Sequence, residues 1–266
     1  MKNKIASTIG GYSGSDLERV FLGLSRAGFK YVELASMQFR HERIPIESMS
    51  QEDISLLGAS MKSHDLTPVS LSGHCVLTTS EGVDCFRRRI DFARDLGMEI
   101  INTGTTADDS PQEAAQFFAN MKDIIPYAQQ RGVRIALETH GGITATAQDC
   151  LHTLERLGSD WVGINYDTAN VIYYCGLRPE KDIELIAPHV IHVHLKDKRG
   201  GINVLDFPPL GDGDIDFKVI VAILHAAGYK GPYSAEIEME DVENPEEEDR
   251  IMERVYEIME RLVLKR

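Results

Sequence analysis

The sequence predicts an α/β protein folded as one closed (β/α)8 barrel. Short apolar runs typical of strands alternate with amphipathic, helix-like segments from end to end of the 266 residues. Alternation of this kind implies a parallel sheet with right-handed crossovers. Eight such units in about 250 residues fit a (β/α)8 barrel. No linker rich in proline, glycine or serine interrupts the run, so we expect a single domain over residues 1–266.

The expected strands favour a barrel over an open, doubly wound sheet. An open sheet of that kind usually carries a glycine-rich phosphate loop directly after its first strand. The sequence at that point, Ile9-Gly10-Gly11, is no such fingerprint. In chain order, the eight expected strands are KIASTIG, YVELAS, TPVSLSGH, EIINTGTT, VRIALETH, WVGINYDT, VIHVHLKDK and GPYSAEIEM.

The helices are indicated by an apolar face and by residues that cap helix ends. Ser50 precedes Asp53 in a capping-box arrangement. Ser110 stands before Pro111 at the start of the fourth helix. Pro126 lies inside that helix, and we expect it to kink the helix or to split it. The expected helices cover residues 15–28, 50–65, 83–97, 110–132, 144–158, 179–187, 216–228 and 245–266.

The composition excludes several classes of partner. The formal net charge is -14, whereas nucleic-acid binding normally needs a basic surface, so we expect no nucleic-acid partner. No apolar stretch approaches the ~18 residues of a membrane span, and we expect no membrane association. The four cysteines form no C-x-x-C pair, and the N-terminal segment does not resemble a signal peptide. We therefore expect a cytoplasmic protein.

The segment RGGINVLDFPPLGDGDID, residues 199–216, is the longest irregular stretch between an expected strand and its helix. Loops that follow strands lie on the face of a barrel that carries active sites. Long loops in compact domains are usually functional. We expect a lid or an interface arm here, with a surface insertion as the alternative.

Four polar residues stand near the C-terminal ends of the last four expected strands: Glu138, Asp167, His194 and Glu236. Alternate residues of a strand point to the same face, and in each of these strands the polar residues share one face while the apolar residues share the other. The C-terminal end of barrel strands is where catalytic groups collect. We therefore expect the four side chains to point inward together.

Such a group of side chains predicts a metal site. Ionisable groups inside a barrel cost much free energy unless a cation compensates their charge. Three carboxylates and one imidazole suit Mn²⁺, Mg²⁺, Co²⁺ or Fe²⁺, and Zn²⁺ gains no special advantage because thiolates are missing. The alternative is that the four residues are salt-bridged members of the core. We expect one bound divalent metal ion.

The chain resembles the xylose isomerase-like TIM barrels, which have an AP endonuclease family 2-type fold. The family includes sugar-phosphate isomerases and epimerases, keto-sugar 3-epimerases, inosose dehydratases and endonuclease IV. The resemblance extends over essentially the whole chain. It lies in the motifs GFKYVEL, ALETHGG, DTAN, HVHLKD, LGDGDIDF and GYKGPYSAEIE.

The resemblance implies roles for the four residues. It makes Glu138, Asp167, His194 and Glu236 the ligands of Mn²⁺ or a similar ion. It also makes Glu138 and Glu236 the catalytic pair, one removing a proton next to a carbonyl and the other returning one to the opposite face. The implied activity is isomerisation or epimerisation of a sugar or sugar phosphate through a metal-bound enediolate. Family members often form dimers or tetramers, so a homo-oligomer is expected.

Five further residues are candidates for substrate binding because they lie near the expected strand ends: Glu33, His74, His140, Asn170 and Lys196. Lys196 could stabilise an oxyanion or bind a phosphate, or it could form an ion pair with Glu33, Asp197 or Glu238. Asn170 stands where many family members have a histidine. The expected ligands are a keto sugar, a sugar phosphate or an inosose.

Two departures weaken a direct assignment as a keto-hexose epimerase. Six residues after Glu138 those enzymes carry another glutamate, and six residues after His194 they carry an arginine. This chain has Thr144 and Gly200 there. The alternative function is therefore a lyase of the inosose-dehydratase or keto-glycoside type that uses the same metal site. Endonuclease IV fits less well, because it gathers many more histidine and acidic ligands.

Overall fold

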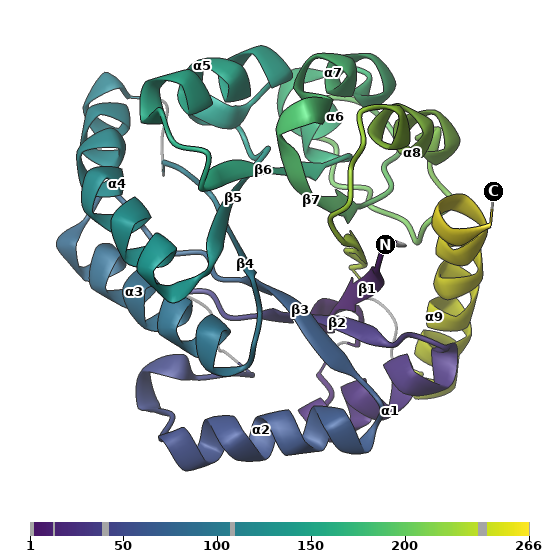
Figure 1. Ribbon diagram of the computed structural model, residues 1–266. Coiled ribbons are helices and arrows are strands. Elements are labelled where there is room, and N and C mark those ends of the chain that lie inside the picture. The colour runs from purple at the N-terminus through teal and green to yellow at the C-terminus, as the bar shows by residue number, and fades with distance from the viewer. Residues whose placement is uncertain (1–2, 13, 39–42, 107–109, 239–243, 266) are drawn as a thin grey trace.

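The computed structural model describes residues 3–12, 14–38, 43–106, 110–238 and 244–265. Within them, eight parallel strands form a closed barrel in which each strand pairs with the next and β8 pairs with β1 (Figure 1). The sequence prediction of a (β/α)8 barrel is therefore confirmed. The strands are β1 (Ile5–Thr8), β2 (Tyr31–Ala35), β3 (Thr67–Ser72), β4 (Ile100–Thr103), β5 (Arg134–Glu138), β6 (Val162–Asp167), β7 (Val190–Leu195) and β8 (Tyr233–Ala235).

The helices surround the barrel as an outer ring, and α9 packs against α1 to complete it (Figure 1). Each helix buries its apolar stripe against the strands, which is how a parallel sheet hides both of its faces. The helices are α1 (Leu17–Ala27), α2 (Gln51–Ser63), α3 (Ser80–Asp95), α4 (Pro111–Arg131), α5 (Ala147–Leu157), α6 (Asn170–Cys175), α7 (Pro179–Ile186), α8 (Phe217–Ala226) and α9 (Pro245–Met259).

Local signals set the helix ends as expected in several places. Ser50 and Asp53 form a reciprocal capping box at the start of α2. Ser110 caps α4 through a 3.2 Å bond from the backbone N–H of Glu113 to its hydroxyl. Splitting of this helix at Pro126 was the wrong alternative, because α4 runs unbroken from Pro111 to Arg131. Its buried apolar face compensates the one hydrogen bond that proline removes.

Two segments differ from the expected pattern. The short helix α6 begins directly after β6, where no helix was expected. Strand β8 is only three residues long, so Glu236 lies just beyond its last residue, Ala235. Both differences concern the C-terminal end of the barrel, where loops are shaped by side-chain contacts.

The barrel interior is polar, unlike the branched apolar filling that is usual for this architecture. Five buried side chains are hydrogen-bonded to one another between the strands: Glu33, Ser70, Asn102, Asn165 and His192. The apolar residues that alternate with these side chains face the helices. The predicted alternation of polar inner and apolar outer faces is consistent with the burial of both sets.

The loop after β7 is held in place by one buried carboxylate. Asp197 accepts hydrogen bonds of 2.9 Å from the backbone N–H groups of Lys198, Gly211 and Gly213. A side chain on Gly213 would collide with this carboxylate. The long segment is therefore anchored at its base on the C-terminal face of the barrel.

Replacing Asp197 by asparagine should lower the free energy of unfolding by about 1–3 kcal/mol, because an amide nitrogen would face backbone donors and leave them unpaired. Urea unfolding measures the change. Asp206→Asn is the matched control, since Asp206 is in the same loop, is partly exposed, and lies 3.8 Å from Arg199. Equal losses in the two variants would contradict the anchoring role.

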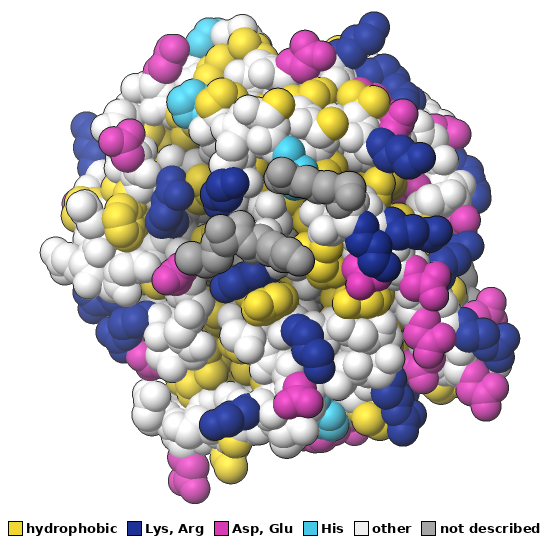
Figure 2. Space-filling model, turned by 45° about the vertical axis from the view of Figure 1, so that its right-hand side comes forward, with side chains coloured by type: hydrophobic (Ala, Val, Ile, Leu, Met, Phe, Trp, Pro, Cys, Tyr) yellow, Lys and Arg dark blue, Asp and Glu magenta, His cyan; other side chains and the backbone are white. Residues whose placement is uncertain are grey.

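The surface seen in Figure 2 carries lysine and arginine side chains interspersed with aspartate and glutamate. Among the described residues, no helix combines the length and the apolar character needed to cross a membrane.

Candidate metal centre

Four side chains meet at the C-terminal end of the barrel. Glu138 and Asp167 are the last residues of β5 and β6, His194 lies near the end of β7, and Glu236 follows β8. One ligand atom from each of them lies within 4.8 Å of the other three. The first three residues are buried, and Glu236 is partly exposed. The parallel register of β6 and β7 places Asp167 directly beside His194.

The contacts inside this quartet join opposite charges. His194 Nδ1 lies 2.8 Å from Glu138 Oε1 and 2.8 Å from Glu236 Oε2. Asp167 Oδ1 accepts 2.8 Å hydrogen bonds from the backbone N–H groups of Ala169 and Asn170. Asp167 Oδ2 is buried and has no hydrogen-bond partner. A buried carboxylate oxygen in that state costs free energy unless a cation is beside it.

The residues present therefore fit a divalent ion. The donor set contains three carboxylates and one imidazole, which are ligands preferred by hard or borderline cations. The unpartnered Oδ2 of Asp167 is a second argument for a bound cation, independent of the types of residue present. The quartet can hold one ion and leave the partly exposed side of Glu236 open to a small molecule.

The charges of the quartet shift one another's pKa. Burial raises the pKa of Asp167 to about 8, and the neighbouring charge of Glu236 adds to the effect. Burial alone would raise the pKa of Glu236, but Lys196 and His194 hold it well below its usual value. The pKa of His194 is raised well above its ordinary value because the carboxylates of Glu33 and Glu236 outweigh its burial.

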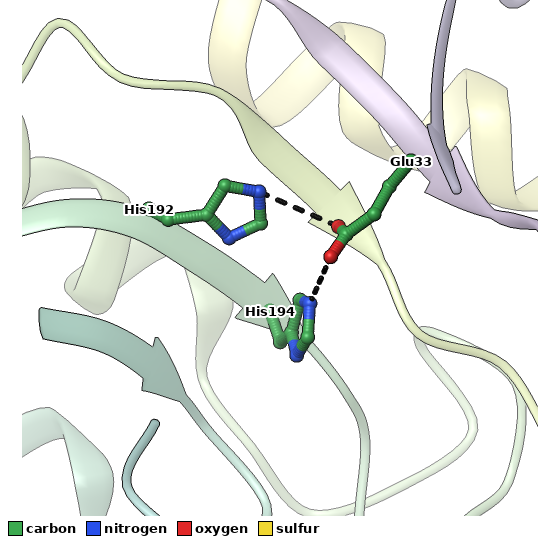
Figure 3. Close-up of side chains that lie close together, drawn as sticks. All are labelled: Glu33, His192 and His194. Carbon is green, nitrogen blue, oxygen red and sulfur yellow. Dashed lines mark hydrogen bonds and ion pairs between the residues drawn. The ribbon is translucent and has the colours of Figure 1, made fainter. Parts of the chain in front are cut away.

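A second group of polar residues lies directly beneath the quartet. Glu33, from β2, points toward His192 and His194 of β7 (Figure 3). Its Oε1 lies 2.9 Å from His194 Nε2, and its Oε2 lies 3.4 Å from His192 Nε2. Burial would raise the pKa of Glu33, but the two imidazoles outweigh burial and lower it to about 2.

The structure places Glu33 away from the open mouth of the barrel. Its side chain is fully buried, and Asn102 Nδ2 also donates to it at 2.6 Å. The side chain lies farther inside the barrel than the strand end, and the substrate-binding role expected for Glu33 stays a prediction. The reason for this depth is the length of β2, which ends two residues beyond Glu33 and leaves its side chain inside the barrel.

His74 and His140 lie on one side of the mouth, with their ring centroids 6.5 Å apart. The backbone N–H of Gly104 donates to His74 Nδ1 at 3.1 Å, so the proton of the neutral ring is on Nε2. That nitrogen lies 3.7 Å from Glu138 Oε2. Burial lowers the pKa of His74, which favours the neutral ring. His140 is exposed and lies 3.1 Å from the hydroxyl of Tyr174.

Lys196 lies on the other side of the quartet. Its Nζ donates to Glu236 Oε1 at 2.8 Å and also to Glu238. The ammonium group stands 4.6 Å from the ring centroid of Phe207. Of the ion pairs that the sequence suggested for this lysine, the one with Glu238 is present. Asn170 is buried at the start of α6 and meets the quartet through its backbone N–H.

Two aromatic residues near the site were not expected from the sequence. Tyr174 comes from the unpredicted helix α6, and Phe207 comes from the loop after β7. The available signal was the pair Tyr173-Tyr174 shortly after the motif DTAN. Aromatic residues that follow a strand end so closely often line a pocket.

Comparisons with known proteins identify the family of the barrel. Residues 22–259 match the family described as xylose isomerase-like TIM barrel. L-Ribulose-5-phosphate 3-epimerase UlaE of Salmonella paratyphi C is 25% identical, with 86% of this chain and 84% of the relative covered.

Solved structures share the fold over nearly all of their length. A xylose isomerase domain protein from Planctomyces limnophilus has a TM-score of 0.78 at 18% identity, with 98% of both chains covered. D-Allulose 3-epimerase from Methylomonas sp. has a TM-score of 0.77 at 19% identity, with 98% of this chain and 97% of that chain covered. The protein belongs to the xylose isomerase-like TIM barrel family.

Proposed function

We propose that this protein is a divalent-metal-dependent epimerase or isomerase that acts on a keto sugar or its phosphate. The observation that carries the proposal is the donor quartet with the buried, unpartnered oxygen of Asp167. The relationship to L-ribulose-5-phosphate 3-epimerases supports the same class of reaction. Epimerisation at C3 of a ketose, next to its carbonyl, is the specific reaction proposed.

Glu138, Asp167, His194 and Glu236 would hold the ion. When bound, a divalent cation would polarise the substrate carbonyl and so acidify the neighbouring C–H bond. Mn²⁺ is the proposed ion, and the same donors suit Mg²⁺, Co²⁺, Fe²⁺ or Zn²⁺.

Two carboxylates are positioned to move protons. Glu138 ends β5 and Glu236 follows β8, and each approaches the same atom, His194 Nδ1, to 2.8 Å. The pKa of each carboxyl is lowered by neighbouring positive charge despite burial, so both groups are ionised at neutral pH and can accept a proton. One would remove the proton next to the carbonyl, and the other would return one to the opposite face.

The mouth offers hydrogen-bond donors of two kinds. His74 presents Nε2–H beside Glu138, and Lys196 presents a buried ammonium beside Glu236. Each could donate to an oxygen that gains negative charge during proton abstraction. His140 and Tyr174 stand farther out and would contact the distal hydroxyl groups of a sugar or its phosphate.

The experiment that tests the proposal is a solvent-exchange screen in deuterium oxide. Metal-loaded protein is incubated with keto sugars, their phosphates and inososes, and ¹H NMR follows each compound. We expect deuterium to enter next to the carbonyl as the C3 epimer forms, and we expect chelation to stop both changes.

Two outcomes would contradict the proposal. Exchange with none of these compounds by metal-loaded protein would exclude carbonyl-directed proton abstraction on them. A product with an enone or diketone absorbance in the near ultraviolet would identify the lyase alternative. Re-adding Mn²⁺ after chelation controls for irreversible loss of the protein.

A further inference from the structure

The carboxylate of Glu33 and the imidazole of His194 form a contact that the proton-transfer chemistry does not use. Glu33 Oε1 lies 2.9 Å from His194 Nε2 (Figure 3), whereas Glu138 and Glu236 approach the other ring nitrogen, Nδ1. The pair lies inside the barrel, with Glu33 fully buried and His194 almost so. Water does not compete for this contact.

The contact determines which nitrogen of His194 faces the quartet as a ligand. An ionised carboxylate only accepts hydrogen bonds, so Nε2 of His194 must carry a hydrogen to pair with Glu33. The other nitrogen, Nδ1, is the atom that lies 2.8 Å from Glu138 and Glu236. A histidine ligand whose remote N–H donates to a carboxylate has a fixed ring orientation and is a stronger base.

The neighbours of Glu33 keep it in this position. Asn102 Nδ2 donates to the same oxygen at 2.6 Å. His192 is close to the other oxygen, and its ring is held by Ser70 Oγ at 2.9 Å and by Asn165 Oδ1 at 2.8 Å. These neighbours are buried and come from four strands, so Glu33 cannot turn away from His194 without also losing its hydrogen bond from Asn102.

We propose that Glu33 is a positioning residue that holds His194 with Nε2 protonated and Nδ1 directed at the metal ion. The inference rests on the metal site of the proposed function. It assigns to Glu33 a role in metal affinity, exerted through His194, in place of contact with the substrate. Loss of such a partner typically lowers metal affinity about 10- to 100-fold.

Mn²⁺ titration of the full-length protein, followed by the EPR signal of free Mn²⁺, tests the inference. Glu33→Gln keeps the shape and an acceptor oxygen but removes the charge, and we expect about 10-fold weaker binding. Glu33→Met removes the acceptor, and we expect a loss of up to about 100-fold. Ser70→Ala is the matched control, since it disturbs the same buried layer through His192 without touching His194. We expect its Kd to stay near that of the wild type.

Each result has a defined meaning. A graded loss in the two Glu33 variants with normal binding by Ser70→Ala supports the inference. Equal binding by wild type and Glu33→Met, or an equal loss in Ser70→Ala, overturns it while leaving the metal site intact. Wild-type protein that binds no Mn²⁺ refutes the proposed function itself, and the inference with it.

A measurement on wild-type protein tests the predicted protonation of His194 even if the Glu33 variants do not fold. Long-range ¹H–¹⁵N spectra of protein loaded with diamagnetic Zn²⁺ report which imidazole nitrogen carries hydrogen. We expect the ring that responds to Zn²⁺ to keep Nε2–H and to bind the ion through Nδ1. Binding through Nε2 would overturn the inference.

Discussion

Replacing Glu236 by glutamine should lower kcat for solvent exchange by about 10²- to 10⁴-fold, the usual contribution of a positioned acid or base. Glutamine keeps an oxygen near Lys196 and His194, but its amide can neither accept the substrate proton nor return one. The rate of deuterium incorporation, measured at saturating Mn²⁺, isolates this loss from weaker metal binding. A variant with wild-type kcat would remove Glu236 from the catalytic pair.

Glu238→Gln is the matched control for that variant. Glu238 also forms an ion pair with Lys196, but it is more exposed and lies outside the quartet. If Glu236 acts on the substrate directly, the Glu238 variant keeps most of its kcat. If both variants lose activity equally, the effect comes from releasing Lys196, and the carboxylate of Glu236 is not the base.

The sequence was sufficient to predict the barrel because both periodicities are strong. Apolar residues alternate in the strands and form stripes in the helices, and caps such as Ser50 and Ser110 mark the boundaries. The same alternation predicted that Glu138, Asp167, His194 and Glu236 would point inward, and the structure brings their ligand atoms together. Their roles as ligands and catalytic groups stay predictions.

The details that sequence reasoning missed depend on contacts between distant parts of the chain. The alternation of β2 points Glu33 inward, but nothing local shows that His194, 161 residues later, lies 2.9 Å from it. Helix α6 is only six residues long, too short to show a helical period, and it brings Tyr174 to His140. Such pairings follow from barrel register, which the linear pattern does not encode.

Metal binding should tighten steeply as the pH rises from 6 to 8. In the metal-free protein the pKa of Asp167 is about 8 and that of His194 is raised well above its ordinary value, so both hold a proton at pH 6. An ion binds the carboxylate of Asp167 and the neutral ring of His194, so its binding releases up to two protons. The affinity for Mn²⁺ should therefore rise by about 10- to 100-fold per pH unit, levelling off for Asp167 above pH 8.

Titrations of wild type and Asp167→Asn at several pH values measure this dependence. The asparagine has no proton to release, so the slope of log Kd against pH should fall by about one relative to wild type. A wild-type Kd that does not change between pH 6 and 8 would contradict the prediction. A slope that is the same in both proteins would show that Asp167 is already ionised before the metal binds.

The protons on Asp167 and His194 also make the stability of the metal-free protein depend on pH. A carboxyl group whose pKa is raised by folding stabilises the fold below its unfolded pKa, and this contribution is lost as the pH rises through the folded value. Asp167 and His194 both act in this direction, so without metal their share of the stability should decrease as the pH rises from 5 to 8. Three carboxyl groups have lowered pKa values, and their stabilising contribution is already fully present in this pH range: Glu33, Glu138 and Glu236.

A bound divalent ion replaces the lost protons as the positive charge of the site. Chelated protein should therefore lose stability across this range while Mn²⁺-loaded protein keeps it, because the quartet needs a cation and accepts either protons or a metal.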